Sequence, residues 1–273
     1  LNPGNNLLMF KNIYNIIICA LINLKSIIRL KSHRVSSVNG GIYVSIDKKK
    51  EKIYFARINR HNRYKRGIMV GIDMLAEQYS LDRINNNGKG LLIDCGANAG
   101  ELGLWSRKNS FEYIAFEPEE LESKCVNLNA KPGSKTFRNA LWKEKARLTI
   151  HSMPNSGDSS VFDMGDAVDK FEIDAVRLDE TVSLDAYDGV VILKVEAEGA
   201  EPEVLEGASG LFDRIDYIAV DCGPERGVEQ DYTFVEVNNL LVDNNFRLCD
   251  VKFDRVTSLY YNKERVSGML KDK

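Results

Sequence analysis

Short apolar runs that each end at a turn, with helical spacing after them, set the strongest limit on what this chain can fold into. The clearest are "LLIDC" (91–95), "EYIAFE" (112–117), "VVILKVE" (190–196) and "IDYIAVDCG" (215–223). A continuous apolar run of this length is typical of a buried strand, and strands that alternate with helices form a parallel sheet. The sequence therefore predicts an α/β, doubly wound and mostly parallel sheet, with ligands at the carboxyl ends of the strands.

The end of the chain departs from that alternation. "FRLCDVKF" (246–253) and "VTSLYYN" (256–262) are separated by only two residues. A parallel crossover needs a dozen or more residues, so a connection this short joins antiparallel neighbours. We expect a parallel sheet that ends in an antiparallel hairpin, which most dinucleotide-binding folds lack.

Composition limits the partners and the compartment. The 273 residues carry a formal net charge of −3 and show no basic face with interleaved aromatic residues, so nucleic acid is not an expected partner. The five cysteines are widely spaced and include no C-x-x-C pair. This pattern favours a reducing compartment, and we expect a cytoplasmic protein.

The first 66 residues differ from the rest, and we predict an N-terminal extension (1–66) followed by one catalytic domain (67–273). Residues 42–58 read as a β-hairpin. Residues 12–24 are uncharged and flanked by Lys and Arg, but they are too short to span a membrane. Two interpretations remain for residues 7–34. They form a helix that packs on the catalytic domain or on another subunit of a homo-oligomer, or a basic amphipathic helix in peripheral contact with an anionic membrane.

The turn "DCGANAG" after the first buried run carries the first candidate site. Gly96 and Gly100 permit a tight turn, and Asn98 stands where a dinucleotide fingerprint has its middle glycine. Glu117 ends the next strand, where an acid hydrogen-bonds ribose hydroxyls. Together with Asp94 this pattern indicates an adenosine cofactor, and it leaves open whether that is NAD or S-adenosylmethionine.

Four segments together resemble the FkbM family of S-adenosylmethionine-dependent methyltransferases. They are "LLIDCGANAGELGLWSRK", "YIAFEPEELESKCVNLNA", "VRLDETV" and "VILKVEAEGAEPEVLEGA". The family usually has K-x-D-x-E-G-x-E in the last of these, so Lys194, Glu198, Gly199 and Glu201 match and Glu196 replaces an aspartate. The resemblance implies the class I methyltransferase fold, a Rossmann-like seven-stranded sheet with a C-terminal antiparallel hairpin.

The resemblance also implies which residues bind the cofactor. Those near the methionine part would be Asp94, Gly96, Asn98 and Gly100. Glu117 would hold the ribose, and Asn139 and Ala140 would lie near the adenine. We also predict Ala97, Pro118 and Glu196 as cofactor-binding residues. Ser159 and Ser160 correspond to a serine-containing loop that would contact the substrate.

Acidic residues that follow two later strands are the candidates for chemistry. We predict Asp221, Glu196 and Glu198 as catalytic carboxylates, because a hydroxyl acceptor loses its proton as it attacks. Alternatively, Glu196 and Asp221 bind Mg²⁺. The candidate substrate residues here are Glu201, Glu225 and Arg226. Alternatively, Glu201 only places a negative charge in the first turn of a helix, where it stabilises the helix. Arg226 can equally form a surface ion pair with Glu225 or Glu229.

The sequence thus predicts an S-adenosylmethionine-dependent O-methyltransferase that acts on a small molecule or glycan. By the resemblance, the acceptor is a carbohydrate hydroxyl of a polysaccharide, glycolipid or nucleotide-linked sugar. Two alternatives are an NAD-dependent oxidoreductase and a non-catalytic Rossmann-like scaffold.

Overall fold

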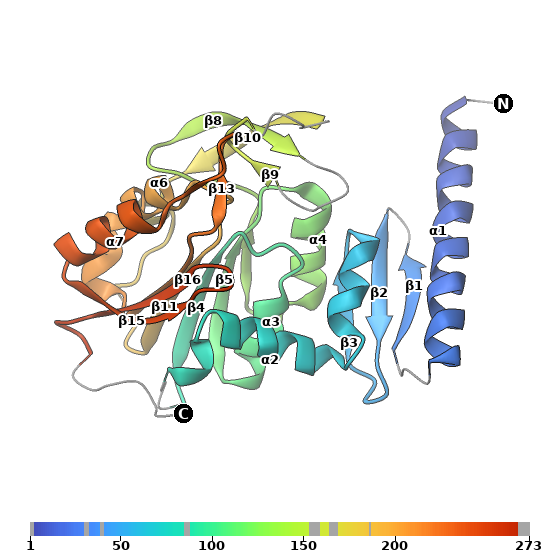
Figure 1. Ribbon diagram of the computed structural model, residues 1–273, viewed down its shortest axis with the longest axis horizontal. Coiled ribbons are helices and arrows are strands. Elements are labelled where there is room, and N and C mark those ends of the chain that lie inside the picture. Colours follow the sequence, from blue (N-terminus) through green and yellow to red (C-terminus); the bar gives the residue numbers. More distant parts are fainter. Residues whose placement is uncertain are drawn as a thin grey trace.

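The structure, a computed structural model, describes residues 3–29, 33–38, 41–84, 88–152, 159–163, 169–185 and 187–266, with side chains from Asn12 onward. Among these residues the main sheet has seven strands in the order β15-β16-β12-β11-β4-β5-β6 (Figure 1). Their bounds are β4 (Gly90–Cys95), β5 (Phe111–Phe116), β6 (Lys135–Phe137), β11 (Val190–Val195), β12 (Tyr217–Asp221), β15 (Phe246–Lys252) and β16 (Thr257–Asn262).

The direction of the strands confirms the predicted topology. β6, β5, β4, β11 and β12 pair in parallel, whereas β16 runs antiparallel to both β12 and β15. This is the strand order of a class I methyltransferase. The strand order reverses between β4 and β11. On one side of β4 lies β5, the next strand of this sheet along the chain, and on the other side lies β11, a much later one. In sheets of this kind the ligand crevice lies outside the carboxyl ends at that reversal.

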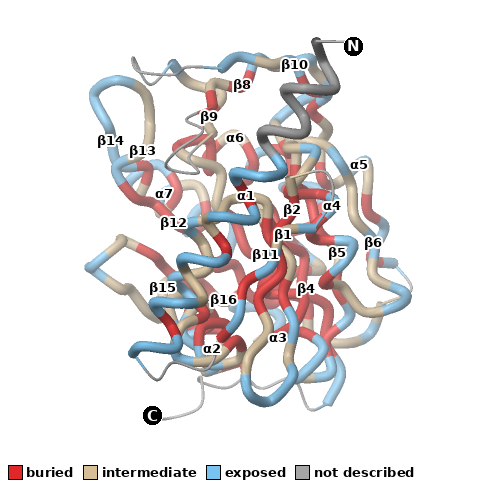
Figure 2. The backbone as a smooth tube through the Cα atoms, turned by 90° about the vertical axis from the view of Figure 1, so that its right-hand side faces the viewer, coloured by how far each residue is buried: buried red, intermediate tan, exposed pale blue. Residues whose placement is uncertain are grey.

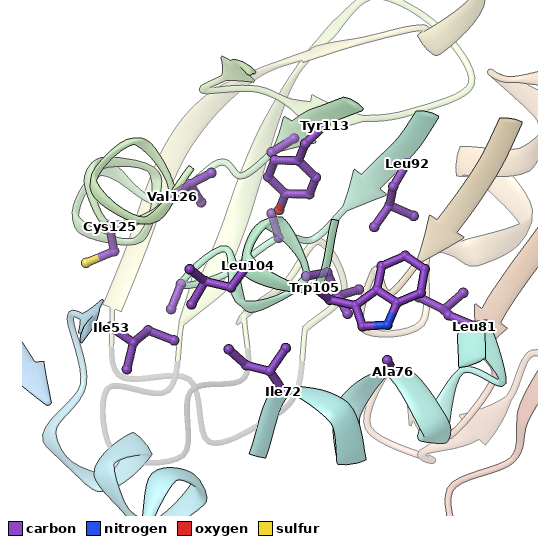
Figure 3. Close-up of a cluster of buried hydrophobic side chains, with 14 of the residues drawn as sticks. Ile53, Ile72, Ala76, Leu81, Leu92, Leu104, Trp105, Tyr113, Cys125 and Val126 are labelled. Carbon is purple, nitrogen blue, oxygen red and sulfur yellow. The ribbon is translucent and has the colours of Figure 1, made fainter. Parts of the chain in front are cut away.

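Helices cover both faces of the sheet because side chains alternate along each strand. In β4, Leu92 packs into one apolar cluster, and Leu91 and Ile93 pack into the other. Figure 3 shows Leu92 beside Trp105 of α3 in the first cluster. The helices on that side are α2 (Ile68–Gln78), α3 (Glu101–Lys108) and α4 (Glu120–Asn129), with the 3₁₀ turns η1 (Ile58–Tyr64) and η2 (Leu81–Arg83). Those on the other side are α5 (Leu178–Thr181), α6 (Glu201–Glu206), η3 (Ser209–Arg214) and α7 (Phe234–Asp243).

The N-terminal part forms a layer at one end of the molecule (Figure 1). The expected hairpin is present as β2 (Ile42–Ile46) and β3 (Lys52–Phe55), and β1 (Arg34–Val38) adds a third strand that the sequence did not indicate. Helix α1 (Pro3–Ile28) lies outside this sheet and contacts β1. Phe55 and Tyr64 belong to the same apolar cluster as Leu92, so the layer shares a core with the main sheet.

The strand β6 at the edge of the main sheet is short, because the chain leaves the sheet after Phe137. Asn139 donates a side-chain hydrogen bond to the Asp174 carbonyl oxygen, which directs the next residues toward a second sheet. That sheet contains β7 (Ala140–Leu141), β8 (Ala146–Ser152), β9 (Ser159–Ser160) and β10 (Asp169–Val176). A two-stranded ribbon, β13 (Pro224–Arg226) with β14 (Asp231–Tyr232), follows β12.

Candidate active site

A cavity of about 390 Å³ lies at the carboxyl ends of β4, β5 and β11, at the reversal of strand order. Three groups of residues line it. The strand ends and the loops after them contribute Cys95, Gly96, Asn98, Phe116, Glu117, Pro118, Glu119, Glu196, Ala197, Glu198 and Ala200. The second sheet and the loops beside it contribute Asn139, Ala140, Leu141, Ile150, Ser159 and Val161. The N-terminal layer and the β15–β16 loop contribute Arg57, Asn59, Arg60, Asn62, Arg63 and Arg255.

The glycine turn after β4 brings two backbone segments into contact. Gly96 has a φ of +70°, and a Cβ atom there would lie 2.0 Å from the Glu196 carbonyl oxygen. Asn98 has a φ of +49°, a left-handed conformation that asparagine tolerates better than most residues. The amides of Gly96 and Ala97 both donate to the Phe116 carbonyl oxygen, at 3.0 and 3.1 Å. The turn is therefore packed between the ends of β5 and β11.

Glu117 presents a buried carboxyl group to the cavity. Its two oxygens accept hydrogen bonds from the Asn98 amide (2.7 Å) and the Glu119 amide (2.9 Å). Burial raises the pKa of Glu117 to about 8, and the nearby negative charges of Glu119 and Glu122 add to the rise. A carboxyl group with only neutral backbone donors suits a neutral ligand group such as a pair of hydroxyls.

Lys194 of β11 binds four oxygens at the neighbouring strand end. Its Nζ lies 3.0 Å from Asp94 Oδ1 and 3.0 Å from Glu196 Oε2. It also donates to the carbonyl oxygens of Cys95 (3.0 Å) and Gly96 (2.9 Å). Burial lowers the pKa of Lys194, but the two carboxylates outweigh it and the net direction is upward. The lysine therefore stays charged and ties the glycine turn to β11.

Glu196 and Asp221 differ in basicity although they share a partner. Arg255 Nη2 lies 2.9 Å from Asp221 Oδ2 and 3.7 Å from Glu196 Oε1. Burial alone would raise the pKa of Glu196, but Lys194 and Arg255 lower it to about 2. Burial raises the pKa of Asp221 to about 6, and the charge of Glu196 adds to the effect while Arg255 opposes it. At neutral pH Glu196 is a weak base held ionised, whereas Asp221 has a basicity suited to proton transfer.

The structure brings about half of the predicted site residues to the cavity. Those that line it are Gly96, Asn98, Glu117, Pro118, Asn139, Ala140, Ser159, Glu196 and Glu198. Those set back from it are Asp94, Ala97, Gly100, Ser160, Glu201, Asp221, Glu225 and Arg226.

Two of the residues set back, Asp94 and Gly100, are packed within the protein. Asp94 was expected to face the cofactor, but its carboxylate is buried and binds Lys194 and the Tyr113 hydroxyl (2.7 Å). Gly100 was expected beside the cofactor, but it begins α3 with a φ of +76°, and a Cβ there would meet Val126 Cα at 3.0 Å. Both residues therefore hold the glycine turn in place through contacts with the protein interior.

Glu201 and Arg226 are also engaged within the protein rather than facing the cavity. Glu201 is fully buried and accepts from the Ala197 amide (3.0 Å), the Gly199 amide (3.1 Å) and the Thr233 hydroxyl (2.8 Å). Arg226 pairs with Glu203 at 2.7 Å, not with Glu225 or Glu229. These contacts stabilise the turn that carries Glu196 and Glu198.

The carboxylates do not fit the alternative Mg²⁺ site. In the described part of the chain, no cluster of three or more His, Cys, Asp or Glu side chains is arranged to hold a metal ion. Arg255 contacts Asp221 and Glu196, and Lys194 contacts Glu196 from the other side. A cation between these carboxylates would meet two positive side chains.

The sequence predicted no site residue among the arginines that line the cavity, which are Arg57, Arg60, Arg63 and Arg255. Arg60 pairs with Glu101 of α3 at 2.5 Å, and Arg57 pairs with Glu119 at 2.7 Å. The basic stretch at residues 61–67 was the available signal, and two of its residues, Asn62 and Arg63, do line the cavity. Arg255 gave no signal, because it reaches the cavity only through the hairpin at the end of the chain.

Comparison with protein families settles the identity of this arrangement. Residues 94–248, more than half of the chain, match the methyltransferase FkbM domain. The chain belongs to the FkbM methyltransferase family. No match to this FkbM protein is found among curated proteins.

Solved structures similar to this FkbM protein are distant in sequence. A TehB-like S-adenosylmethionine-dependent methyltransferase from Corynebacterium glutamicum has 8% identity over 68% of this chain and 85% of its own, with a TM-score of 0.38. A putative methyltransferase from Listeria monocytogenes has 7% identity over 69% and 97%, with a TM-score of 0.41. Magnesium protoporphyrin IX methyltransferase from Synechocystis, solved with its methyl donor bound, has 12% identity over 69% and 76%, with a TM-score of 0.39.

The cofactor of this FkbM protein is S-adenosylmethionine, and the cavity fits it. The close approach at Gly96 leaves the turn without side-chain bulk, Glu117 offers a buried acceptor for ribose hydroxyls, and Phe116 adds an apolar surface. Leu141, Ile150 and Val161 extend that apolar surface on the second sheet. The methyl donor supplies an activated methyl group, so the protein has only to hold the two reactants in line.

Proposed function

We propose that this methyltransferase transfers the methyl group to a carbohydrate hydroxyl. The observation that carries the proposal is the polar wall of the cavity, which carries Glu196 and Glu198 as well as Asn59, Asn62 and the arginines of η1. Carboxylates accept hydrogen bonds, whereas amides and guanidinium groups donate them. A wall with both kinds of group suits a ligand rich in hydroxyls, each of which donates and accepts.

In this proposal Glu196 orients the acceptor and Asp221 takes its proton. Glu196 is ionised at neutral pH and accepts a hydrogen bond from the reacting hydroxyl. Asp221 lies behind Arg255, whose side chain is 40% exposed on the β15–β16 loop. Even with Arg255 beside it the pKa of Asp221 is about 6, above that of Glu196, so Asp221 is the stronger base and the acceptor reaches it when the Arg255 side chain moves aside.

The rival acceptors are carboxylates and amines. A carboxylate acceptor needs no base, because it loses no proton as it attacks. An amine acceptor would bring a positive charge next to Arg60, Arg63 and Arg255, all of which line the cavity. A carboxylate acceptor would leave the raised basicity of Asp221 without a role.

The test is to incubate the enzyme with methyl-labelled S-adenosylmethionine and panels of sugars, carboxylic acids and amines, and then to treat the product with mild base. A methyl ether on a sugar keeps its label, whereas a methyl ester loses it. Label on sugars that survives base supports the proposal. Label that is released by base, or that goes only to amines, contradicts the hydroxyl acceptor.

A further inference from the structure

Helix α1 has its polarity reversed relative to an ordinary surface helix. Its polar side chains face the protein: Asn15 accepts a hydrogen bond from the Tyr43 hydroxyl at 2.9 Å. Asn23 bonds both the amide and the carbonyl of Val35, each at 2.8 Å, and Ser26 is buried. These hydrogen bonds hold the helix on β1 and β2, together with Cys19 and Ile22, which pack against the apolar cluster beneath it.

The opposite side of α1 is apolar. Eight large side chains there have exposed fractions of 45–72%, namely Ile13, Tyr14, Ile16, Ile17, Leu21, Leu24, Ile27 and Ile28. At about 100° per residue, the isoleucines and leucines fall on the side away from Asn15 and Ser26. Figure 2 views the molecule from this side and shows exposed segments along α1 in front of β1. Contiguous apolar surface of this kind marks an interaction site.

The segment of the sequence that contains α1 carries no acidic residue. Residues 1–46 contain no Asp or Glu and five Lys or Arg residues, at positions 11, 25, 29, 31 and 34. Two of these, Lys25 and Arg29, line a hollow at the end of α1 together with His61 and Lys65. The rest of the chain is acidic, since the whole carries a net charge of −3. Lys25 and Arg29 thus add positive charge to the helix that carries the apolar face.

We propose that the outer face of α1 docks on an anionic lipid surface, with the helix lying in the plane of the membrane. Apolar side chains enter the boundary between headgroups and acyl chains, while lysine and arginine at the edge contact anionic headgroups. None of the helices in the described part of the chain has the length and hydropathy to cross a membrane, which agrees with an interfacial position. Lys25 and Arg29 beside the apolar face argue against a second copy as the occupant, because it would bring the same positive charge.

The test is sedimentation of the whole protein with vesicles of phosphatidylcholine alone and with equal parts of phosphatidylglycerol. We expect binding to the anionic vesicles, and at least tenfold weaker partitioning for Ile17→Glu combined with Leu24→Glu. Lys25→Gln with Arg29→Gln should weaken binding to anionic vesicles by about fivefold per residue and leave neutral vesicles unaffected. Val235→Glu is the matched control, because Val235 is equally exposed but lies on α7.

Three results would overturn the membrane proposal. The first is that anionic vesicles fail to pull down wild type. The second is that the double glutamate variant binds them as well as wild type does. The third is a dimer, seen by light scattering, that Leu24→Glu dissociates. Binding of S-adenosylhomocysteine by each variant shows that its catalytic domain is folded. Because the vesicle assay needs neither acceptor nor turnover, its outcome is independent of the proposed acceptor class.

Discussion

Two carboxyl groups that line the same cavity behave in opposite ways. Glu117 follows β5, accepts hydrogen bonds from two backbone amides, and has a pKa raised to about 8. Glu196 follows β11, contacts Lys194 and Arg255, and has a pKa lowered to about 2. Desolvation acts to raise the pKa of both groups, so it does not explain the opposite directions. A cation within hydrogen-bond reach decides which way the group shifts.

The contrast divides the cavity into two halves with different tasks. The half around Glu117 carries backbone amides and apolar side chains, which suit the neutral ribose and adenine of the cofactor. The half around Glu196 carries a network of opposite charges, which is maintained by Lys194. Of the four predictions that follow, two alter the charged half, one alters the cofactor half and one alters the contact between them.

The largest effect is expected from Lys194→Met. This change leaves the buried carboxylate of Asp94 without its cation and leaves Glu196 with Arg255 alone, and breaking a buried pair in this way costs about 3–5 kcal/mol. Urea unfolding should show a loss of that size. Lys89→Met is the control, because Lys89 pairs with Asp188 on the exposed surface and should change the free energy of unfolding by less than about 1 kcal/mol. If Lys194→Met lowers the free energy of unfolding no more than Lys89→Met does, the charged half does not depend on its lysine.

The next effect concerns the point where the two halves meet. Gly96→Ala would place a Cβ 2.0 Å from the Glu196 carbonyl oxygen and so push the glycine turn away from β11. We expect binding of S-adenosylhomocysteine to weaken by at least about 100-fold, which corresponds to about 2.7 kcal/mol. Gly133→Ala is matched, since Gly133 also has a positive φ but open space around its Cβ position. If the two variants bind equally well, the contact at Gly96 does not shape the cofactor half.

The fold was predictable from sequence to the extent that its signals are local. The apolar runs at β4, β5, β11 and β12 reflect strands buried on both faces, and the short link between β15 and β16 leaves only an antiparallel pairing. β1 was missed because a five-residue edge strand with alternating small polar residues has little apolar signal. The break after Phe137 depends on a contact with β10, which lies about thirty residues later and carries no local mark.

The site was predictable where the glycine turn and strand ends supply residues in sequence order. Four residues that follow strand ends line the cavity, as their positions in the sequence predicted: Gly96, Asn98, Glu117 and Glu196. The sequence could not show that Lys194 forms an ion pair with Asp94, because this pairing depends on the register between β4 and β11. Nor could it show that Arg255 pairs with Asp221, because the two meet only when β16 is inserted beside β12.

A smaller effect, on turnover rather than binding, is expected for Asp221→Asn. The carboxylate of Asp221 has to be deprotonated to accept a proton, so wild-type kcat should fall as the pH drops through about 6. The variant should lose at least about tenfold in kcat above that pH, lose the step near pH 6, and bind S-adenosylhomocysteine as wild type does. Asp216→Asn is the control, because Asp216 pairs with Arg265 away from the cavity. A step near pH 6 that persists in Asp221→Asn would assign the proton to another group.

The smallest effect is expected for Glu117→Gln, and it should depend on pH. The pKa of Glu117 is about 8 in the cofactor-free protein, so below that pH the group is mostly neutral and resembles the amide that replaces it. Above it the wild-type carboxylate is a stronger acceptor for ribose hydroxyls. Calorimetric titration with S-adenosylhomocysteine should therefore give nearly equal affinities near pH 6 and an advantage for wild type of about tenfold near pH 9. Glu196→Gln should show no such dependence between those pH values, because Glu196 stays ionised throughout. A constant ratio for Glu117→Gln would mean that Glu117 is already ionised at pH 6, and the contrast between the two carboxyl groups would disappear.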